Sequence, residues 1–224
     1  MIGVVVPAHD EEEHIEAAIR GLLAASTHPG LHGEEVRLLF VLDACGDATA
    51  EIVLQHGLRA LHVDLRNVGM ARALGADCLA GEGVRWLAFT DADTVVATDW
   101  LVAQLGVGTP VVCGTIGVDD WALHPPPVGA RFVAEYQDRD GHRHVHGANL
   151  GLCTEAYRAV GGFAPLAAHE DRTLVEALER AGFTIGWSAA PRVVTSTRLR
   201  SRAPEGFAHA IRAHYAELGL VPVV

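Results

Sequence analysis

Residues 3–23 read GVVVPAHDEEEHIEAAIRGLL, an apolar run followed by a cluster of acids and then by a segment with helical periodicity. The run at 3–6 is continuously apolar, which is typical of a parallel strand buried on both faces. Asp10 precedes Glu13 by three residues, the spacing of a capping box at the start of a helix. This stretch therefore predicts a strand, a loop and a helix, the repeating unit of an α/β fold.

The same alternation continues through the first part of the chain. Three more apolar runs predict strands and two segments between them predict helices: 36–42, 58–63 and 86–90 for the strands, 48–56 and 69–80 for the helices. Strands that alternate with helices form a mostly parallel sheet that is covered on both faces. We therefore expect a three-layer, Rossmann-like α/β fold, and the length of 224 residues fits a single domain.

Beyond residue 93 the alternation becomes less regular. The pattern predicts strands or extended segments at 111–116, 144–152, 183–187 and 193–197, and helices at about 125–136, 154–160, 172–181 and 204–218. Because we find no internal repeat or flexible linker, we expect these elements to complete the same domain.

Charge and composition exclude several classes of function. The chain has 17 basic and 28 acidic residues and a formal net charge of −11, which does not suit a nucleic-acid binder or a protein of anionic membrane surfaces. All the basic residues are arginines. Walker P-loops, Schiff-base enzymes and protein kinases are therefore excluded, because each needs a lysine.

The cysteines and the apolar segments indicate the compartment. Cys45, Cys78, Cys113 and Cys153 form no CxxC pair, so we expect reduced thiols rather than a disulfide framework. The first residues do not resemble a signal peptide, and no window approaches the roughly 18 uninterrupted apolar residues of a transmembrane helix. We therefore expect a cytoplasmic protein without a transmembrane segment.

Acidic residues follow three of the predicted strands in the first half of the chain. They are Asp10 and Glu11 after the first strand, Asp43 and Asp47 after the second, and Asp91 and Asp93 after the fourth. Ligands of open α/β sheets bind beyond the carboxyl ends of the strands, so these carboxylates should converge. Asp10 and Asp47 are equally well placed to cap helices. Two carboxylates one residue apart, as in Asp91 and Asp93, suit Mg²⁺ or Mn²⁺ bound together with ligand phosphates.

A further acidic pair lies at the predicted start of a helix, in the sequence HED at 169–171. Acids at a helix N-terminus interact favourably with the helix dipole, which is a structural reason for their presence. A carboxylate in this position can also act as a general base that accepts a proton from a hydroxyl. The segment alone leaves both interpretations open.

Taken in order, seven segments resemble the family 2 glycosyltransferases of the nucleotide-sugar-binding GT-A fold. The segments are VVVPAHDEE, DACGDAT, NVGMARALG, DAD, HGANLGL, GGF and HEDRTLVEALERAG, and they cover residue 1 to about 187. The resemblance implies an inverting, metal-dependent hexosyltransferase that uses a UDP- or GDP-sugar, an acceptor hydroxyl and Mg²⁺ or Mn²⁺. The QxxRW motif of processive synthases does not follow the HED sequence, so we expect single transfers.

The resemblance also implies a role for each motif residue. The donor nucleotide would contact Pro7, Ala8, Asp10, Glu11, Asp43, Asn67, Gly69, Arg72, Asp91 and Ala92. Asp93 would be the direct metal ligand of the DxD motif and Asp171 the catalytic base. Glu170 would support that base or touch the acceptor. The donor sugar would lie beside Gly147, Ala148 and Asn149. The single domain would then comprise a nucleotide-binding half at 1–100, an acceptor and catalytic half at 101–195, and a C-terminal arm and helix at 196–224.

Three alternating histidines end at the first residue of the HGANLGL segment. Alternation in an extended segment places His142, His144 and His146 on one face. Such a face can bind a transition metal. The alternative, which we favour, gives them separate roles, with His142 solvated and His146 reaching the donor or acceptor site.

Three alternating arginines lie outside the shared pattern. Arg198, Arg200 and Arg202 follow the last predicted strand. They form either a solvated basic edge or a clamp for the phosphates of the donor or of a phosphorylated acceptor. The sequence leaves these alternatives open.

Two other functions are compatible with the same fold. A non-catalytic sugar-nucleotide-binding or scaffold module predicts a damaged DxD or ED motif, and both are intact. A sugar nucleotidyltransferase predicts a glycine-rich basic loop after the first strand, where this chain has the acidic PAHDEE. A glycosyltransferase is therefore the preferred hypothesis. The sequence leaves the oligomeric state and the identity of the acceptor open.

Overall fold

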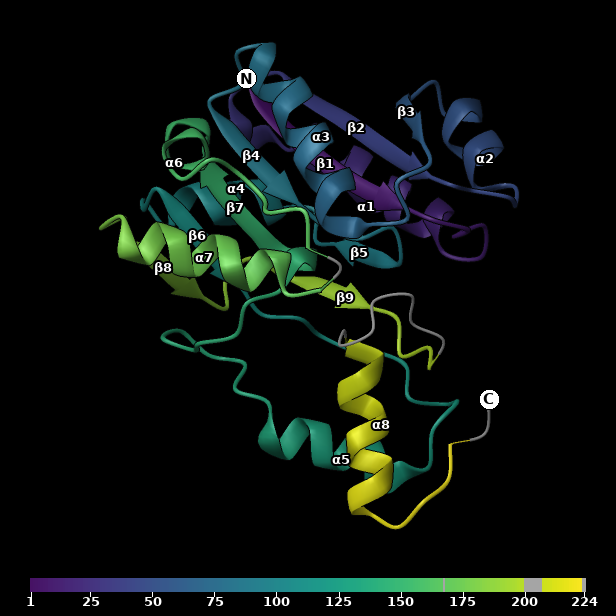
Figure 1. Ribbon diagram of the computed structural model, residues 1–224. Helices are drawn as coiled ribbons and strands as arrows, with labels where there is room; N and C mark the ends of the chain where they lie inside the picture. The colour runs from purple at the N-terminus through teal and green to yellow at the C-terminus, as the bar shows by residue number, and fades with distance from the viewer. Residues whose placement is uncertain (167, 200–206, 223–224) are drawn as a thin grey trace.

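The computed structural model describes residues 1–166, 168–199 and 207–222. The expected α/β fold with a mostly parallel central sheet in a single domain is confirmed (Figure 1). The seven strands of this sheet are β1 (Ile2–Ala8), β2 (Val36–Asp43), β3 (Arg59–Val63), β4 (Trp86–Phe89), β6 (Val111–Gly114), β7 (Leu150–Cys153) and β8 (Ile185–Ser188). Their order is β3-β2-β1-β4-β7-β6-β8. Among these strands, β7 is antiparallel to both of its neighbours and the other pairs are parallel.

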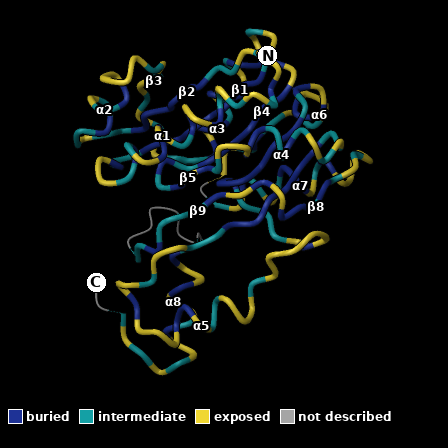
Figure 2. Tube along the Cα trace, turned by 180° about the vertical axis from the view of Figure 1, so that it is seen from behind, coloured by how far each residue is buried: buried dark blue, intermediate teal, exposed yellow. Residues whose placement is uncertain are grey.

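Helices cover both faces of the sheet. They are α1 (Ile15–Ser26), α2 (Thr49–Gln55), α3 (Val68–Gly81), α4 (Trp100–Gly106), α6 (Thr154–Ala159) and α7 (Glu170–Arg180), with single turns η1 (Pro29–Leu31) and η2 (Gly147–Asn149). Side chains of β1 alternate between two cores, because Val4 and Val6 pack in the α1 core and Val5 packs in the α3 and α7 core. The strand β1 is therefore buried along its whole length (Figure 2), as the continuous apolar run predicts.

A two-stranded sheet joins the end of the chain to the acidic turn after β4. In it β5 (Thr94–Val96) pairs antiparallel with β9 (Val193–Thr195). Thr94 Oγ1 also donates to Thr195 Oγ1 at 3.0 Å, and Ser196 N donates to the carbonyl of Asp93 at 3.2 Å. The segment after β9 is thereby held against the DxD turn.

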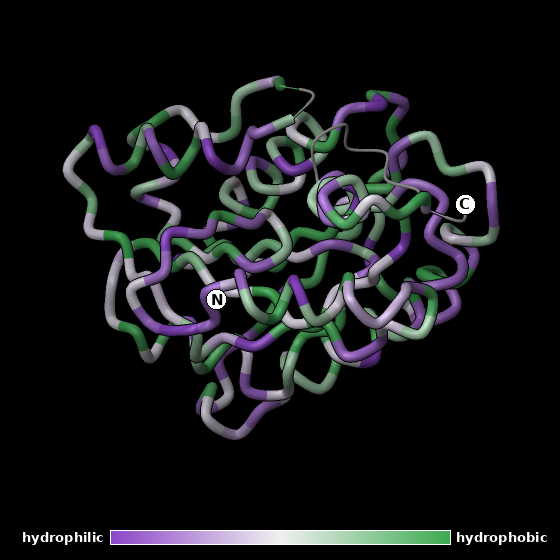
Figure 3. The backbone as a smooth tube through the Cα atoms, turned by 90° about the horizontal axis from the view of Figure 1, so that it is seen from below, coloured by the Kyte–Doolittle hydropathy of each residue, from purple (hydrophilic) through white to green (hydrophobic). Residues whose placement is uncertain are grey.

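Two helices form a small lobe beside the main sheet. They are α5 (Pro126–Glu135) and α8 (Phe207–Glu217), which lie against each other below the sheet in Figure 1. Their shared core is built around Val128, Ile211 and Tyr215. Hydrophilic and hydrophobic stretches are interleaved along the trace when the molecule is seen from below (Figure 3). In the part of the chain that the structure describes, each helix is too short or too polar to cross a membrane.

The predicted capping box is wrong. The helix α1 begins at Ile15, and its N-cap residue His14 makes no side-chain capping bond. Asp10 instead adopts a left-handed backbone with φ of 50°, and its Oδ1 accepts from Gly46 N at 2.6 Å. The acid therefore ties the first loop to the second rather than capping a helix. Asp47 does accept from Thr49 N at the start of α2, at 3.0 Å.

Candidate functional site

One cavity of about 960 Å³ opens beyond the carboxyl ends of β1, β2 and β4 and extends to the lobe of α5 and α8. It brings together many of the site residues predicted from the sequence. These are Pro7, Ala8, Glu11, Asp43, Asn67, Arg72, Asp91, Ala92, Asp93, His146, Gly147, Ala148, Glu170, Asp171 and Arg198. Residues from positions 7 to 198 thus converge on one site, as the rule for open α/β sheets predicts.

Asn149 is predicted beside the donor sugar, but the structure does not bring it to the cavity. Its side chain is fully buried. The amide donates to the carbonyls of Thr115 and Pro191 at 2.7 and 2.9 Å and accepts from Trp100 Nε1 at 2.8 Å. Asn149 therefore fastens η2 to α4 and to the segments after β6 and before β9, and any effect on a ligand would be indirect.

Asp10 and Gly69 also lie away from the cavity walls. Asp10 is engaged with Gly46 in the loop described above. A Cβ on Gly69 would come within 2.8 Å of the Leu166 carbonyl oxygen and 3.0 Å of Glu170 Cβ. Glycine at this position lets α3 pack closely against the segment that leads to α7. Gly69 therefore affects the cavity through this packing and does not line it.

The remaining predicted positions, Arg200 and Arg202, lie outside the described residues. The same is true of the beginning of the last predicted helix, at 204–206. The described part of that helix, α8, supplies Phe207 to the cavity wall.

Arg72 connects the DxD motif to the ED motif. Its Nη1 pairs with Glu170 Oε1 and its Nη2 with Asp91 Oδ1. The guanidinium is buried against Gly147, where any Cβ would collide with it. Burial lowers the pKa of Arg72, but the charges of Asp91, Glu170 and Asp171 outweigh this and raise it above the ordinary value. Arg72 therefore stays charged and holds the two acidic motifs together.

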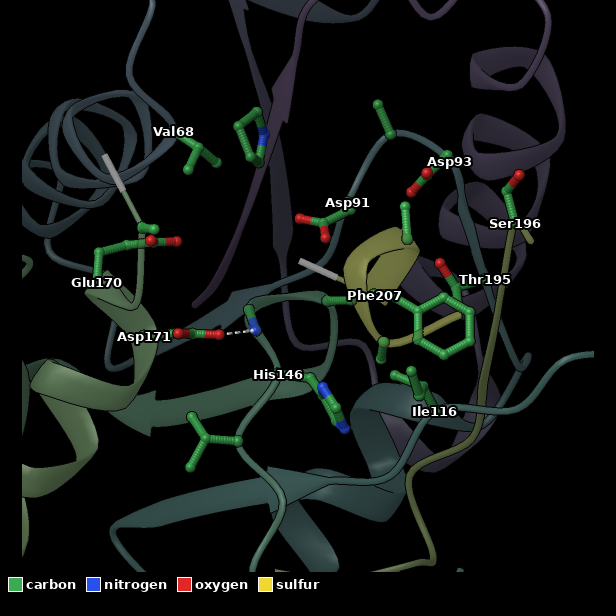
Figure 4. A pocket seen from close by; sticks show the side chains of 18 of the residues that line it. Val68, Asp91, Asp93, Ile116, His146, Glu170, Asp171, Thr195, Ser196 and Phe207 are labelled. Atoms are coloured by element: carbon green, nitrogen blue, oxygen red, sulfur yellow. Dashed lines mark hydrogen bonds between the residues drawn. The ribbon is translucent and has the colours of Figure 1, made fainter. Parts of the chain in front are cut away.

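Glu170 and Asp171 have different environments although they are neighbours in α7. Glu170 is buried, and burial raises its pKa while Arg72 opposes the shift. Asp171 is partly exposed to the cavity. Its Oδ2 accepts from Gly147 N and its Oδ1 from Arg172 N, both at 2.7 Å. The carboxylate of Asp171 is thus fixed by backbone amides and faces the cavity near Asp91 (Figure 4).

Asp43 organises the loop between β3 and α3. Its Oδ1 accepts from Leu65 N and Arg66 N at 2.6 and 2.8 Å, and its Oδ2 accepts from Asn67 N at 2.9 Å. Asn67 in turn caps α3 by accepting from Met70 N at 3.0 Å. Asp43, which the resemblance places at the donor nucleotide, therefore also shapes one wall of the cavity.

Asp93 lies deeper than Asp91 and shares the cavity with Glu11. Burial raises the pKa of Asp93 to about 6; the charge of Arg198 opposes this shift, and those of Asp91 and Glu11 add to it. Arg198 donates to both oxygens of Glu11 at 2.5 and 2.6 Å and lies 2.9 Å from Asp93 Oδ2. This end of the cavity is thus crowded with carboxylates and holds a guanidinium between them.

The donor set is suitable for a hard divalent cation. Asp91 and Asp93 both offer carboxylate oxygens, which Mg²⁺ and Mn²⁺ prefer. Among the described residues, no three His, Cys, Asp or Glu side chains converge closely enough to hold a metal by themselves. Mg²⁺ in nucleotide sites commonly uses one or two carboxylates and completes its shell with phosphates and water. The residues therefore fit a cation that binds together with a diphosphate.

The three alternating histidines form a stack rather than a metal centre. The rings of His142 and His144 are 5.5 Å apart, and those of His144 and His146 are 5.8 Å apart. The prediction that His142 is solvated is wrong. Its side chain is fully buried beside Trp187, and its Nε2 is 3.4 Å from the carbonyl of Ser188. The strand β8 packs on His142, and the alternating pattern of histidines in the sequence does not reveal this contact.

His146 is the member of the stack that precedes Gly147, whose amide donates to Asp171. Tyr136 Oη accepts from Ile116 N at 2.9 Å, so its own hydrogen is available to His146 Nε2, also at 2.9 Å. When Tyr136 donates in this pair, the imidazole is neutral and carries its proton on Nδ1. Burial, together with the neighbouring histidines, lowers the pKa of His146 to about 3. His146 is therefore uncharged at neutral pH.

Several wall residues were not predicted from the sequence. Ile116, Phe132, Thr195, Ser196 and Phe207 line the cavity, and Figure 4 shows the Phe207 ring between Ile116 and Thr195. Phe132 stacks on Tyr136, with ring centroids 4.8 Å apart. These residues come from α5, α8 and segments near the ends of short strands. Packing of the lobe brings them together, and no sequence motif indicates that they line the cavity.

Comparisons with known proteins identify relatives of this arrangement. The model of the family described as Glycosyl transferase family 2 matches residues 3–151. No curated protein matches the chain closely enough to count as a relative.

Solved structures with the same fold include two kinds of enzyme. S. aureus TarS 1-349 with UDP is 16% identical with a TM-score of 0.64, and the match covers 88% of this chain and 61% of that one. The same protein with UDP-GlcNAc is 14% identical with a TM-score of 0.66, at 100% and 68% coverage. Glucosyl-3-phosphoglycerate synthase from Mycobacterium tuberculosis, with Mn²⁺, UDP and glucosyl-3-phosphoglycerate, is 18% identical with a TM-score of 0.62, at 99% and 81% coverage. At these identities the likeness shows a shared fold, and this chain spans 61% of the length of the first TarS structure.

Proposed function

Because the chain belongs to glycosyl transferase family 2, we propose that it transfers a sugar from a nucleoside-diphosphate sugar to an acceptor hydroxyl. One observation carries the proposal. The cavity that contains Asp91 and Asp93 after β4 also contains Asp171 at the start of α7. A site for a diphosphate and its cation thus lies beside a carboxylate that can act as a base. The structural neighbours that contain UDP or UDP-GlcNAc make a UDP-sugar the first donor to test, and a GDP-sugar the alternative.

Asp171 is the base in this proposal. The acceptor oxygen forms a bond to the anomeric carbon while the bond from that carbon to the phosphate oxygen breaks. The electron pair of the broken bond leaves with the diphosphate, and the acceptor proton moves to a carboxylate oxygen of Asp171. A single displacement of this kind inverts the anomeric configuration. The amides of Gly147 and Arg172 hold the carboxylate in place for this step.

Glu170 and Arg72 support the base without taking part in proton transfer. Glu170 is buried and paired with Arg72, so its carboxylate is engaged by a guanidinium. Arg72 pairs at its other end with Asp91. This connection fixes the start of α7 relative to the DxD turn, which holds Asp171 at a constant position relative to a bound donor.

Asp93, with Asp91 beside it, would hold Mg²⁺ or Mn²⁺. When bound, the cation neutralises the charge that develops on the leaving diphosphate. Pro7, Ala8 and Asn67 form the wall that would face the nucleoside. Gly147 and Ala148 would adjoin the donor sugar, and the lobe of α5 and α8 would bound the acceptor.

Calorimetric titration of UDP, GDP, CDP and dTDP, each with Mn²⁺ and with EDTA, tests the proposal. We expect one nucleotide to bind and to lose about tenfold or more in affinity when the metal is removed. Asp93→Asn should remove most of this metal dependence. Absence of binding for all four nucleotides under both conditions would refute the assignment to nucleotide-sugar chemistry. Tight binding without any transfer to screened acceptors would favour a non-catalytic binding module.

A further inference from the structure

Arg198 bridges two carboxylates of the cavity. Its Nη1 and Nη2 donate to Glu11 Oε2 and Oε1 at 2.6 and 2.5 Å, and Nη2 is 2.9 Å from Asp93 Oδ2. The side chains of Arg198, Glu11 and Asp93 are 28%, 8% and 15% exposed. Charge-assisted pairs with this forked geometry are among the strong hydrogen bonds of proteins. The guanidinium is therefore a cation that neutralises Asp93.

The backbone holds Arg198 in this place. Antiparallel pairing of β9 with β5 sets Thr195 opposite Thr94, the residue after Asp93. Ser196 N then donates to the carbonyl of Asp93. Arg198 follows two residues later, so the sheet fixes its distance from the DxD turn independently of its charge. The contact is thus a consequence of the fold rather than of a chance surface ion pair.

The position of Arg198 conflicts with direct binding of a metal by Asp93. A divalent cation on Asp93 would lie close to the guanidinium, and like charges at such distances repel each other. A bound nucleoside diphosphate changes this balance, because its phosphate oxygens attract both cations. Guanidinium groups match phosphate oxygens with two parallel hydrogen bonds. The cavity can therefore hold both positive charges when the diphosphate is present.

We infer that Arg198 is a positioning residue that exchanges partners when the donor binds. Without donor it neutralises Glu11 and Asp93; with donor and metal it leaves Asp93 and pairs with the diphosphate. This inference rests on the proposed function, since it requires a nucleoside diphosphate in the cavity. Because the nucleotide draws Arg198 away from Asp93, the metal binds weakly alone and strongly with the nucleotide. Coupling between two ligands is reciprocal, so the metal strengthens nucleotide binding by the same factor.

Arg198→Gln separates the two roles. Mn²⁺ alone, titrated by electron paramagnetic resonance, should bind this variant about fivefold more tightly, because its competitor at Asp93 is gone. UDP in saturating Mn²⁺ should bind the same variant about tenfold more weakly. A purely structural role for Arg198 does not change the two affinities in opposite directions.

Three further variants sharpen the test. Arg143→Gln removes the same charge from the cavity lining, where Arg143 pairs with Glu179 and lies over Trp187, and should leave the affinity for Mn²⁺ unchanged. The double variant Arg198→Gln with Asp93→Asn should lose the gain in Mn²⁺ affinity. Arg198→Lys keeps the charge without the fork, so Mn²⁺ affinity should stay near that of wild type while UDP binding weakens.

Unchanged or weaker Mn²⁺ binding by Arg198→Gln would overturn the partner exchange, as would unchanged UDP binding. If Arg198→Gln does not fold, tighter Mn²⁺ binding by Arg198→Lys would overturn it. Failure of the wild-type protein to bind any nucleotide would instead refute the proposed function. The Mn²⁺ titrations without nucleotide distinguish that outcome from a failure of the inference about Arg198.

Discussion

The partly buried, neutral histidine His146 makes the protein sensitive to acid. Burial lowers its pKa to about 3 from an ordinary 6.5. The unfolded chain therefore binds the proton more readily, so the stability that the neutral ring supports is complete above the ordinary pKa and is lost as the pH falls toward about 3. Between about pH 7.5 and about pH 5 the linkage relation gives a loss of about 2 kcal/mol, and any folded-state pKa below about 4 gives nearly the same value.

His146→Gln removes this source of pH dependence. The amide oxygen can still accept from Tyr136, while no group titrates at this position. Urea unfolding followed by tryptophan fluorescence should show a loss of stability between the two pH values that is smaller by about 2 kcal/mol than in wild type. His209→Gln alters an exposed histidine of α8 and is the matched control, which should follow wild type. An equal loss for His146→Gln and wild type would refute the reasoning that the ring stays neutral in the folded protein.

Two further substitutions test the packing and the electrostatics of the structure. Gly147→Ala places a methyl group against the Arg72 guanidinium and should cost about 1–3 kcal/mol in urea unfolding. Gly81→Ala, where a Cβ would meet nothing within 4 Å, should cost nothing, and equal effects of the two would contradict the close contact. Glu34 pairs with Arg85 and the N-terminal amine, and the hydrogen bond from Arg85 lowers its pKa to about 2 although burial opposes the shift. The stability that the Glu34 carboxylate contributes is present above its ordinary pKa of 4.5 and is lost as the pH falls toward about 2. Because Arg85 is exposed, Glu34→Gln should lower the free energy of unfolding by only about 1 kcal/mol at neutral pH. No change in the urea unfolding midpoint would show that the pair contributes nothing.

Much of the fold follows from local patterns that the sequence displays directly. The continuous apolar run of β1 and the turn at Asp91 and Asp93 each depend on neighbouring residues, and both lie in the structure where the pattern predicts. The three-residue strand β5 was not predicted, because it is too short to show a period. Its pairing with β9 nevertheless decides where Arg198 lies.

The ion pairs and hydrogen bonds of the site join residues that are far apart in the sequence. Arg72 was assigned to the nucleotide from its motif, yet its guanidinium is held by Asp91 and by Glu170, 98 residues away. Asn149 was assigned to the sugar, yet packing of η2 turns its amide into the protein. A motif marks the segment that builds a site, whereas the direction of each side chain is set by tertiary packing that a single sequence does not reveal.

The central claim is that Asp171 accepts the proton of the attacking hydroxyl while the rest of the site binds the donor. The most direct measurement compares wild type with Asp171→Asn, using release of UDP from a UDP-sugar and UDP affinity in Mn²⁺ on the same preparations, with Asp119→Asn as an exposed control. The account predicts that Asp171→Asn loses UDP release by about 10²–10⁴-fold and keeps its UDP affinity within about twofold. Release at the wild-type rate from Asp171→Asn would contradict the account.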